Sequence, residues 1–435
     1  MPLNDHPDRI GLANELHARP FPLLDAACRV SHIAVTAPPG QQDDARRHVL
    51  DLCERFGAVR PSDRAPQHNF DAGRFRVKWE WHTEFLALTV MAGPASPAHR
   101  PFDAPAIDLL PKDWLAALPG AVLSAVHIHG ESLPEGETLG PHPIPDHLAP
   151  HFSIDSLVGG SLFDDSARFW GDFRIHEDGF MRFVVRSVAG FDRALTGRIV
   201  QRLVEVETYR AASMMSVPAA RGVWPQLNEI DTALAETTAA VGGGSAATER
   251  VMLDKITELS ARIETITAEN AYRLDASRAY AAIVWRRIKV LSATPLKGQM
   301  NLESFMMRRY DPAMRSCEAT RGRLATLSER ATRAATLLRT RIDVALEEQN
   351  REVLASMNER TARALRLQET VEGLSVVAIG YYAVSLAAML VAPLAKGAGI
   401  SETMTKGLLV LPVIGLVWMF VRRVKNHAME ASGGE

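Results

Sequence analysis

The sequence predicts an α+β domain with a mostly antiparallel sheet, followed by a long α-helical stalk or coiled-coil region and a C-terminal hairpin of two transmembrane helices. Short apolar or alternating runs bounded by Gly, Pro, Asp or Asn dominate as far as about residue 188, which is typical of strands. The apolar period then becomes helical and does not revert. Two charge-free apolar stretches, 374–394 and 407–421, follow near the C-terminus. The predicted domains are therefore 1–190, 191–372 and 373–425, with a basic tail to 435.

Strands and two helices account for the first predicted domain. The spacing of apolar residues indicates helices at 41–59 and 112–118. Glu177-Asp178-Gly179 predicts a tight hairpin turn, because glycine readily takes a positive φ. We expect a largely antiparallel sheet with helices on one face. The predicted strands are residues 30–36, 74–81, 85–92, 121–129, 168–176 and 180–188.

Helices account for the second predicted domain, at residues 195–215, 223–241 and 248–291. From Pro312 one helix is predicted to continue into the first apolar stretch. Its apolar or small residues recur in steps of four, three and four, which approximates an eleven-residue repeat. Such a narrow stripe needs a helical partner. The partner is either the helix at 248–291 folded back or the same helix in another subunit, so we expect a homo-oligomer through the stalk helices.

The two apolar stretches predict a membrane protein whose partner is the lipid bilayer. Residues 374–394 are long enough to cross about 30 Å of hydrocarbon. The second stretch reaches a spanning length as 404–421, with Lys406 snorkelling; the alternative is a single crossing followed by an interfacial helix. The positive-inside tendency places both termini in the cytoplasm, and residues 1–17 lack the apolar core of a signal peptide. The flanking bases are Arg360, Arg363, Arg366, Arg422, Arg423 and Lys425.

Composition indicates the compartment more than the activity. The formal net charge of −2 gives no global field that would attract nucleic acid, so no nucleic-acid partner is expected. Three widely separated cysteines suit a reducing compartment. Gly242-Gly243-Gly244-Ser245 lacks the preceding strand and the Gly-Lys-Ser/Thr of a phosphate loop, and reads as a helix stop. No motif indicates a cofactor or a reaction.

An alternating set near the N-terminus is the first candidate binding site. Glu15, His17 and Arg19 come just before Pro20-Phe21-Pro22, and an extended segment would present all three to one side. One interpretation is a clamp for a ligand or partner, in which Arg19 grips a carboxylate or phosphate. The other is an N-terminal arm held by salt bridges.

A second alternating set, Glu80, His82 and Glu84, lies on a predicted strand or at its turn. Same-face spacing allows an acid–base pair or a metal site, but solvent-facing positions of a half-buried sheet explain the set without any chemistry, and we favour that interpretation. Histidines form a further group without a cysteine or acidic ligand at motif spacing, and no metal site is predicted from them. They are His127, His129, His142, His147 and His151.

Two residue groups are expected to join structural parts. Arg198, Arg202, Glu205 and Tyr209 lie at i, i+3 and i+4 spacings where the sheet domain ends. We interpret them as the joint between the sheet domain and the helical stalk, with exposed intrahelical ion pairs as the alternative. In the first apolar stretch, polar and small residues either pack helices together or line a path across the membrane. These residues are Gly380, Tyr381, Tyr382 and Ser385.

Blocks along nearly the entire chain resemble the domain-of-unknown-function 3422 family of predicted membrane-anchored bacterial proteins. The resemblance implies a multi-pass protein of the bacterial inner membrane and supplies no catalytic residues. Trp81 departs from it, since a basic residue is expected there. The blocks are Asn14 to Pro22, Trp79-Glu80 with His82 to Phe85, Asp172-Phe173-Arg174 with Asp178-Gly179-Phe180, Gly197-Arg198 through Gln201-Arg202-Leu203 to Glu207-Thr208-Tyr209-Arg210, and Leu367-Gln368 with Thr370 to Ser375.

The predicted architecture is also similar to that of CorA-type magnesium channels, whose first span lines a pentameric pore. The Gly-Met-Asn signature of those channels is absent, and the corresponding place reads Val391-Ala392-Pro393-Leu394-Ala395-Lys396-Gly397. The sequence therefore favours a non-enzymatic, oligomeric scaffold or sensor that couples a cytosolic domain through a stalk to the membrane. A divergent ion channel or transporter is the alternative. A soluble-domain enzyme with a cleft around Glu80 is the third hypothesis.

Overall fold

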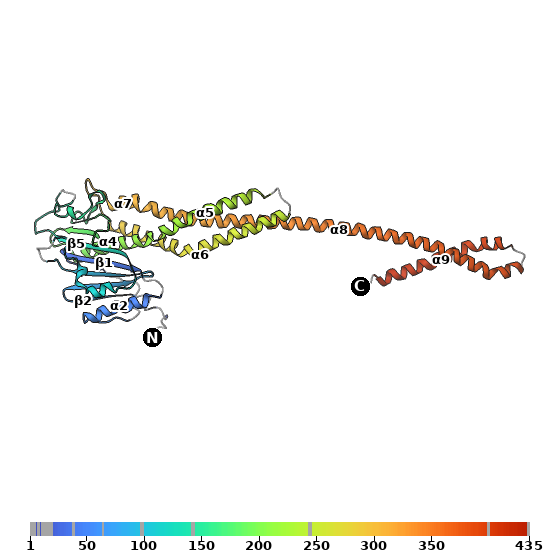
Figure 1. Ribbon diagram of the computed structural model, residues 1–435, viewed down its shortest axis with the longest axis horizontal. Helices are drawn as coiled ribbons and strands as arrows, with labels where there is room; N and C mark the ends of the chain where they lie inside the picture. The colour runs from blue at the N-terminus through green and yellow to red at the C-terminus, as the bar shows by residue number, and fades with distance from the viewer. Residues whose placement is uncertain are drawn as a thin grey trace, which may run out of the picture. The chain divides into compact units, whose positions relative to one another are not determined.

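The computed structural model describes residues 6, 9, 21–36, 40–62, 65–95, 100–140, 144–241, 246–397 and 401–432. The chain forms two compact units (Figure 1). The first comprises Met1–Gly242 with Asp254–Ala335, and the second comprises Gly243–Leu253 with Thr336–Glu435. Glu15, His17, Arg19 and His142, which the sequence singled out, lie outside the described residues.

A mixed sheet, eight-stranded in the part of the chain that the structure describes, organises the first unit. Its order is β2-β3-β4-β1-β5-β8-β7-β6. Only β5 and β8 pair in parallel, and the other neighbours are antiparallel. This confirms the α+β class. The strands are β1 (Cys28–Thr36), β2 (Gln67–Asp71), β3 (Phe75–Trp81), β4 (Phe85–Ala92), β5 (Ala121–Ser132), β6 (Val158–Leu162), β7 (Ala167–Gly171) and β8 (Met181–Ser187).

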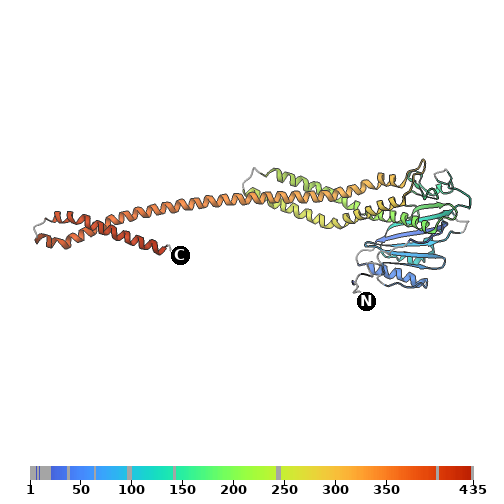
Figure 2. The same ribbon diagram turned by 180° about the vertical axis from the view of Figure 1, so that it is seen from behind.

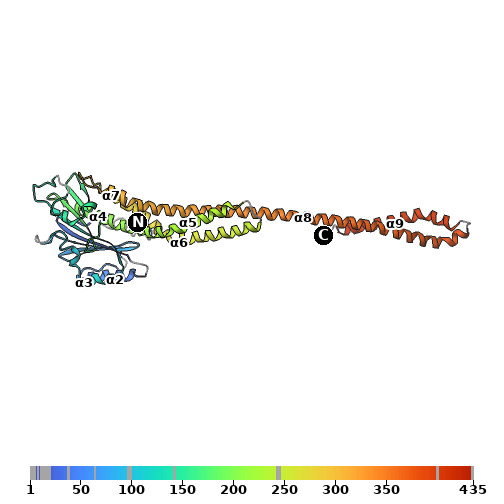
Figure 3. The ribbon, with the colours of Figure 1, turned by 45° about the horizontal axis from the view of Figure 1, so that its top comes forward.

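Helices cover both faces of the sheet, so the expectation of helices on one face was wrong. Helices α2 (Gln42–Arg55) and α3 (Lys112–Ala116) cover one face, and α4 (Arg193–Met214) covers the other (Figure 3). The physical reason lies in the central strands: β4 is buried at seven of its eight positions, whichever face they point to. A strand that is apolar on both sides needs a cover on both sides.

Helices follow the sheet as predicted, with some changes of boundary. Helix α5 (Ser216–Ala239) begins earlier than expected and contains Pro225, and α7 (Leu302–Arg309) was not predicted. Helix α6 (Ala246–Leu291) and α8 (Asp311–Gly397) match their predictions, and α9 is Glu402–Ser432. Short 3-10 helices occupy Ala106–Leu109, Ala149–His151 and Ile154–Ser156. Both views in Figures 1 and 2 show α5 and α6 beside the N-terminal part of α8.

Polar contacts tie these helices together within the first unit. Asp231 of α5 accepts hydrogen bonds from Arg323 at 3.1 Å and Arg330 at 2.5 Å, both on α8. Ser277 of α6 lies 3.6 Å from the sulfur of Met314 on α8, and Ser216 of α5 donates to the Ser277 hydroxyl at 2.8 Å. Helices α5, α6 and α8 are thus linked through their side chains.

Two strands at the ends of the sheet were not predicted, and one predicted strand is shorter. β2 is a polar five-residue strand, and β6 contains Gly159 and Gly160. The outer side of β6 bonds to the connection between α6 and α7, where the Gly159 N–H donates to Met300 O and the Ser161 N–H donates to Thr294 O. β7 ends at Gly171 instead of 176 because Phe173 takes a φ of 52°. The predicted turn forms, with Gly179 at φ 82°, but residues 172–180 separate the strands.

The second unit contains two apolar helical segments. The apolar segment of α8 and residues Thr403–Arg423 of α9 are each long and apolar enough to cross a membrane. The α8 candidate reaches Val391 and so covers most of the predicted stretch 374–394, and the α9 candidate contains 404–421. On α8, every residue from 346 to 371 is exposed. Glu249 pairs with Arg341 at 2.8 Å within this unit.

The residues predicted to pack or to line a path lie on α8 in different settings. A Cβ added at Gly380 would lie 3.9 Å from a side-chain carbon of Ile414 on α9. Tyr381 and Tyr382 are exposed and their ring centroids are 5.8 Å apart. The Ser385 hydroxyl donates to the Tyr381 carbonyl at 2.9 Å, so the helix itself satisfies it.

Candidate ligand-binding pocket

A cavity of about 280 Å³ lies between the sheet and helices α4 and α6 in the first unit. Alternation along β3 points Lys78 and Glu80 toward α4, while Val77, Trp79 and Trp81 enter the core under α2. His82, just after the strand, continues the polar row. The other polar lining comes mainly from Glu205, Thr208 and Arg287. The apolar part comes from side chains such as Phe21, Phe85 and Val204.

A buried ion pair forms the floor of this pocket. Lys78 Nζ lies 3.1 Å from Glu80 Oε1, and the two side chains are 5% and 13% exposed. Removing one partner of such a pair typically costs about 3–5 kcal/mol, because the other charge is left buried without compensation. Both residues of the pair are therefore needed for stability. Together they offer a positive and a negative group to a ligand in the pocket.

His32 of β1 is a neutral hydrogen-bonding group beside this pair. Its Nδ1 lies 2.8 Å from Thr89 Oγ1 and its Nε2 lies 3.1 Å from Thr208 Oγ1. Burial, and to a smaller extent the nearby His82 and Lys78, lower the pKa of His32 to about 3. The imidazole links β1 to β4 and to α4 without carrying charge at neutral pH.

Helices α4 and α6 form the opposite wall. Glu205 accepts a hydrogen bond from Gln201 at 2.9 Å and pairs with Arg287 of α6 at 2.5 Å. Arg202 stacks over the Phe21 ring at 5.8 Å. Burial lowers the pKa of Arg202, and the charge of Arg287 adds to that effect. The wall is therefore held by charges that belong to two different helices.

Gly197 fixes the segment that closes one side of the pocket. A Cβ at this position would lie 1.7 Å from the carbonyl oxygen of Pro22, a distance that no side chain tolerates. The absence of a side chain lets α4 approach the backbone of Phe21 and Pro22, which line the pocket. The predicted clamp at Glu15, His17 and Arg19 comes immediately before this segment in the sequence.

The structure brings several predicted residues together at this pocket. Glu80 and His82 line it with Glu205 and Tyr209, whose ring centroid lies 6.0 Å from that of His82. Arg202 stands beside it, and Arg198 acts on the pKa of Arg202 as a further positive charge.

Glu84 does not line this pocket. Its carboxylate pairs with Arg273 of α6 at 2.6 Å, and together with burial it raises the pKa of Tyr280. Two ion pairs therefore reach α6 from this part of the first unit, one from Glu205 of α4 and one from Glu84 in the turn before β4.

Sequence reasoning missed Lys78, His32 and Arg287. Lys78 was within reach, because it lies two residues before Glu80 and thus on the same face of the strand. His32 and Arg287 gave no local signal, since they meet β3 only through the tertiary fold. The arrangement offers paired charges of both signs, a neutral imidazole and a threonine hydroxyl around a half-apolar space. That chemistry suits a small polar ligand with hydrogen-bonding groups.

The histidine group predicted without a metal is divided in the structure. The His127 ring stacks on Phe180 with centroids 3.8 Å apart, and its Nδ1 lies 2.9 Å from the Ser31 hydroxyl. The Nε2 atoms of His129 and His147 instead lie 3.4 and 3.0 Å from the Glu131 carboxylate. Among the residues that the structure describes, no group of three His, Cys, Asp or Glu has a geometry that could hold a metal ion.

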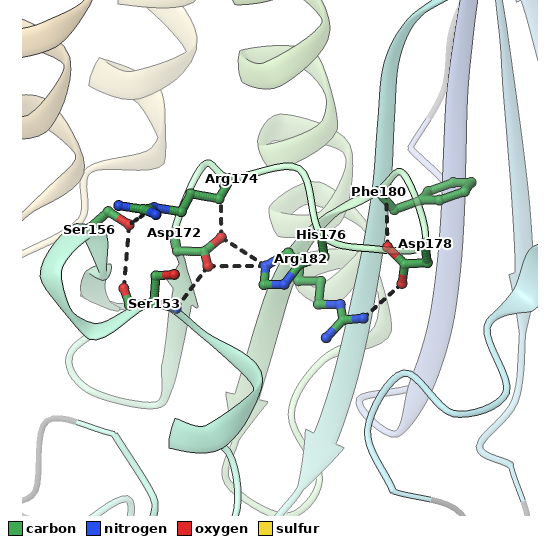
Figure 4. A network of polar contacts seen from close by, with 8 residues as sticks. All are labelled: Ser153, Ser156, Asp172, Arg174, His176, Asp178, Phe180 and Arg182. Carbon is green, nitrogen blue, oxygen red and sulfur yellow. Dashed lines mark hydrogen bonds and ion pairs between the residues drawn. The ribbon is translucent and has the colours of Figure 1, made fainter.

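A buried carboxylate organises the connection between β7 and β8 (Figure 4). Asp172, 1% exposed, accepts hydrogen bonds from the backbone N–H groups of Ser153 and Arg174, at 3.0 and 3.1 Å. The His176 ring nitrogen lies 3.0 Å from the same carboxylate. Farther along, Asp178 accepts from the Phe180 N–H at 3.0 Å and from Arg182 at 2.8 Å. These contacts give the Asp172 and Asp178 blocks a structural role.

The fold and the pocket define a class: an α+β sheet domain with an internal polar pocket, in one chain with a long helical region that carries two apolar helices. A family model described as a protein of unknown function, DUF3422, matches residues 4–428. The chain belongs to this family, which confirms the resemblance seen in the sequence. No curated protein and no solved structure matches the chain.

Proposed function

We propose that this protein is a non-enzymatic, self-associating sensor or scaffold of the bacterial inner membrane. In this proposal the sheet domain is cytosolic and binds a small polar ligand in the pocket around Lys78 and Glu80. The helical region passes the bound state to two membrane spans. Both termini are cytoplasmic, as the basic residues flanking the apolar stretches favour.

The observation that carries the proposal is that α8 is one helix from Asp311 to Gly397. Its first turns are built into the packed first unit, where Cys317, Leu324 and Leu327 are buried. Its last turns contain an apolar window long enough to cross a membrane. A continuous helix transmits rotation or translation better than a flexible linker does, so the same element can serve both ends.

Contacts inside the first unit supply a route from the pocket to this helix. The Glu205–Arg287 pair, at 2.5 Å, joins the pocket wall to α6. Helix α6 contacts α8 through Ser277 and Met314, and again where the Ser328 hydroxyl donates to Glu264 at 3.3 Å. A ligand that competes for Arg287 would shift α6 and, through it, α8. Such a shift requires that the ligand bind the two arrangements with different affinity.

Self-association is supported by the exposed part of α8. The stripe of apolar and small residues that includes Val353, Ala364, Leu367 and Val371 lies within 346–371, where every residue is exposed. Val353, Leu367 and Val371 are 52%, 69% and 57% exposed. An apolar stripe at this spacing is what a second helix would cover, and a second copy of α8 offers the same repeat.

Cysteine cross-linking in membranes tests this association with a matched pair of variants. The native Cys28, Cys53 and Cys317 are all buried, so an introduced cysteine is the reactive one. We expect oxidation to link Ala364→Cys into dimers and to leave Ala362→Cys monomeric. Both positions are exposed alanines, and two residues along a helix place them about 200° apart. Equal cross-linking of the two variants, or none in either, contradicts a defined helix pair.

The coupling is tested by perturbing the pocket and measuring at the stalk. Lys78→Met removes the cation of the Lys78–Glu80 pair, and we expect it to change the cross-linking rate at Ala364→Cys severalfold. Adding Ala355→Pro interrupts α8 between the two places and should abolish that change, while membrane extraction stays as in the parent. An unchanged rate in Lys78→Met, in protein whose tryptophan fluorescence is native, argues against coupling. A metal-carrying pentamer by native mass spectrometry would instead favour an ion channel.

A further inference from the structure

A second cavity, of about 370 Å³, lies in the first unit near the end of β5. It is lined by the start of β1, by the end of β5 and by residues of the connections around Arg100, Phe102 and His147. None of its lining residues is shared with the pocket around Lys78 and Glu80. The function proposed above makes no use of it.

The charge around this cavity is strongly unequal. Its lining includes the guanidinium groups of Arg29, Arg100 and Arg186, and the one carboxylate among the lining residues is Glu131. Three positive charges and one negative charge leave an excess of two positive charges before any histidine is protonated. The nearby Asp103 accepts the Arg100 backbone N–H at 3.3 Å and does not line the cavity. A cavity with such an excess attracts anions.

Glu131 positions several of the groups that line the cavity. Its carboxylate lies 3.0 Å from His147 Nε2, 3.4 Å from His129 Nε2 and 3.5 Å from Arg186 Nε. Burial by itself would raise the pKa of Glu131, but hydrogen bonds from His129 and His147 bring the pKa below its ordinary value. The group therefore stays ionised, with two histidine rings and the Arg186 guanidinium gathered around it.

Two guanidinium groups retain donors for an additional ligand. The Arg186 Nε is buried and makes no hydrogen bond, although it forms an ion pair with Glu131 at 3.5 Å. Arg100 is an exposed lining residue, and its side chain forms no ion pair within the described part of the chain. Arg29 is already committed, since it donates to the carbonyl oxygens of Gly93 and Ala104 at 3.1 and 2.6 Å. Arg100 and Arg186 are thus the two candidates for contacting an anion.

The wall beside these groups is held in an unusual backbone conformation. Phe102 has a φ of 71°, which is rare for a bulky residue and persists only where the surroundings determine it. Its ring centroid lies 6.0 Å from that of His129, and the Arg182 guanidinium carbon lies 5.1 Å from it. Arg182 is fixed in turn by Asp178 (Figure 4). Preformed walls of this kind are typical of ligand sites.

We propose that this cavity is a binding site for a small dianion, either a phosphate or a dicarboxylate. Arg100 and Arg186 contact the anion as paired charged donors, the geometry in which guanidinium groups recognise such ligands. Glu131 orients Arg186 and His147 and at the same time limits the affinity by its own negative charge. Phe102 closes the apolar side.

Isothermal titration of the full-length protein in detergent, in low-salt buffer at pH 7, tests the proposal with inorganic phosphate and succinate as probes. Saturable binding of phosphate alone, or of succinate alone, supports the site and identifies the class of anion. Arg100→Gln and Arg186→Gln should each weaken that binding by about tenfold or more, as expected when a charged hydrogen bond is lost. The matched control Arg47→Gln, on an exposed part of α2, should bind as the parent does.

A second variant separates this role from a structural one. Glu131→Gln removes the competing negative charge and should tighten anion binding severalfold, whereas a merely structural residue would weaken it. The proposal is overturned if neither probe saturates by about 10 mM, the weak end of specific affinity. It is equally overturned if Glu131→Gln, still folded by fluorescence, binds the anion more weakly than the parent.

Discussion

Acid should destabilise the sheet domain through two buried neutral histidines, His32 and His127. Burial is the largest cause that lowers the pKa of His32 to about 3 and the pKa of His127 to about 4. In the unfolded chain both return to an ordinary pKa of about 6.5. The unfolded state therefore binds more protons than the folded state below pH 6.5. The stabilisation is complete above that pH and is lost as the pH falls toward the folded values.

The magnitude follows from the same values. Between pH 7 and pH 5 each histidine should cost the folded state about 2 kcal/mol of stability, since one pKa unit corresponds to about 1.36 kcal/mol. The two together should remove about 4 kcal/mol, a large part of a typical domain stability of about 5–15 kcal/mol. Carboxylates with a lowered pKa, such as Glu131 and Asp178, act in the same direction. Only variants of the histidines themselves can isolate their share.

Urea unfolding followed by tryptophan fluorescence measures this effect in the full-length protein. Of the seven tryptophans, Trp418 alone lies outside the first unit, so the Trp418→Phe background reports that unit. His32→Gln and His127→Gln should each reduce the difference in unfolding free energy between pH 7 and pH 5 by about 2 kcal/mol. Replacing the exposed His6 by Gln should not change it. A pH difference as large in both buried variants as in the parent would refute the reasoning.

Three further outcomes follow from the packing and the apolar helices. Gly197→Ala should lower the unfolding free energy in the same urea titration by about 1–3 kcal/mol, because the added Cβ meets the Pro22 carbonyl. Gly222→Ala, with open space around it on α5, should raise the unfolding free energy by about 0.5–1 kcal/mol. Asp172→Ala should cost about 2–3 kcal/mol or more by orphaning the two backbone donors that it accepts, with a lower thermal midpoint as the readout. Leu386→Arg should raise the apparent free energy of inserting 374–394 into a membrane by about 3–4 kcal/mol in an insertion assay.

Controls decide between these effects and general damage. Equal losses in Gly197→Ala and Gly222→Ala would contradict the close approach of α4 to Pro22. A thermal midpoint unchanged in Asp172→Ala would mean that the Ser153 and Arg174 donors find other acceptors. For the apolar helix, insertion of 374–394 with Leu386→Arg at the parent's free energy would count against a span at that place.

The sequence predicted those elements whose pattern is local. β4 matches its prediction at both ends, and α6 ends where predicted, because alternation and helical spacing are set by neighbouring residues. β2, with the sequence Gln-His-Asn-Phe-Asp, was missed because an edge strand exposes polar side chains. β6 was missed because its two glycines weaken the strand signal; they are needed where Phe169, Trp170 and Ala293 come within 3 Å of the places their Cβ atoms would take.

The candidate pocket was predictable only in part, for a similar reason. Glu80 and His82 were visible as an alternating pair, and Glu205 and Tyr209 as neighbours on a helix. That the two sets face each other depends on α4 crossing the face of β3 and β4, which no local pattern encodes. The parallel pairing of β5 with β8 is also non-local, since β6 and β7 come between them in the chain.

The two ends of the sheet have a consequence for how copies of this chain meet. β2 is short and polar, and the outer side of β6 is already bonded to Thr294 and Met300. A bare strand edge would act as a template for the strands of another molecule, and crowding on a two-dimensional surface would make such encounters frequent. Blunt edges at both ends remove this route to aggregation. Copies anchored in a membrane as proposed could then lie close together. They would contact one another through side chains, and not through unpaired backbone groups at a strand edge.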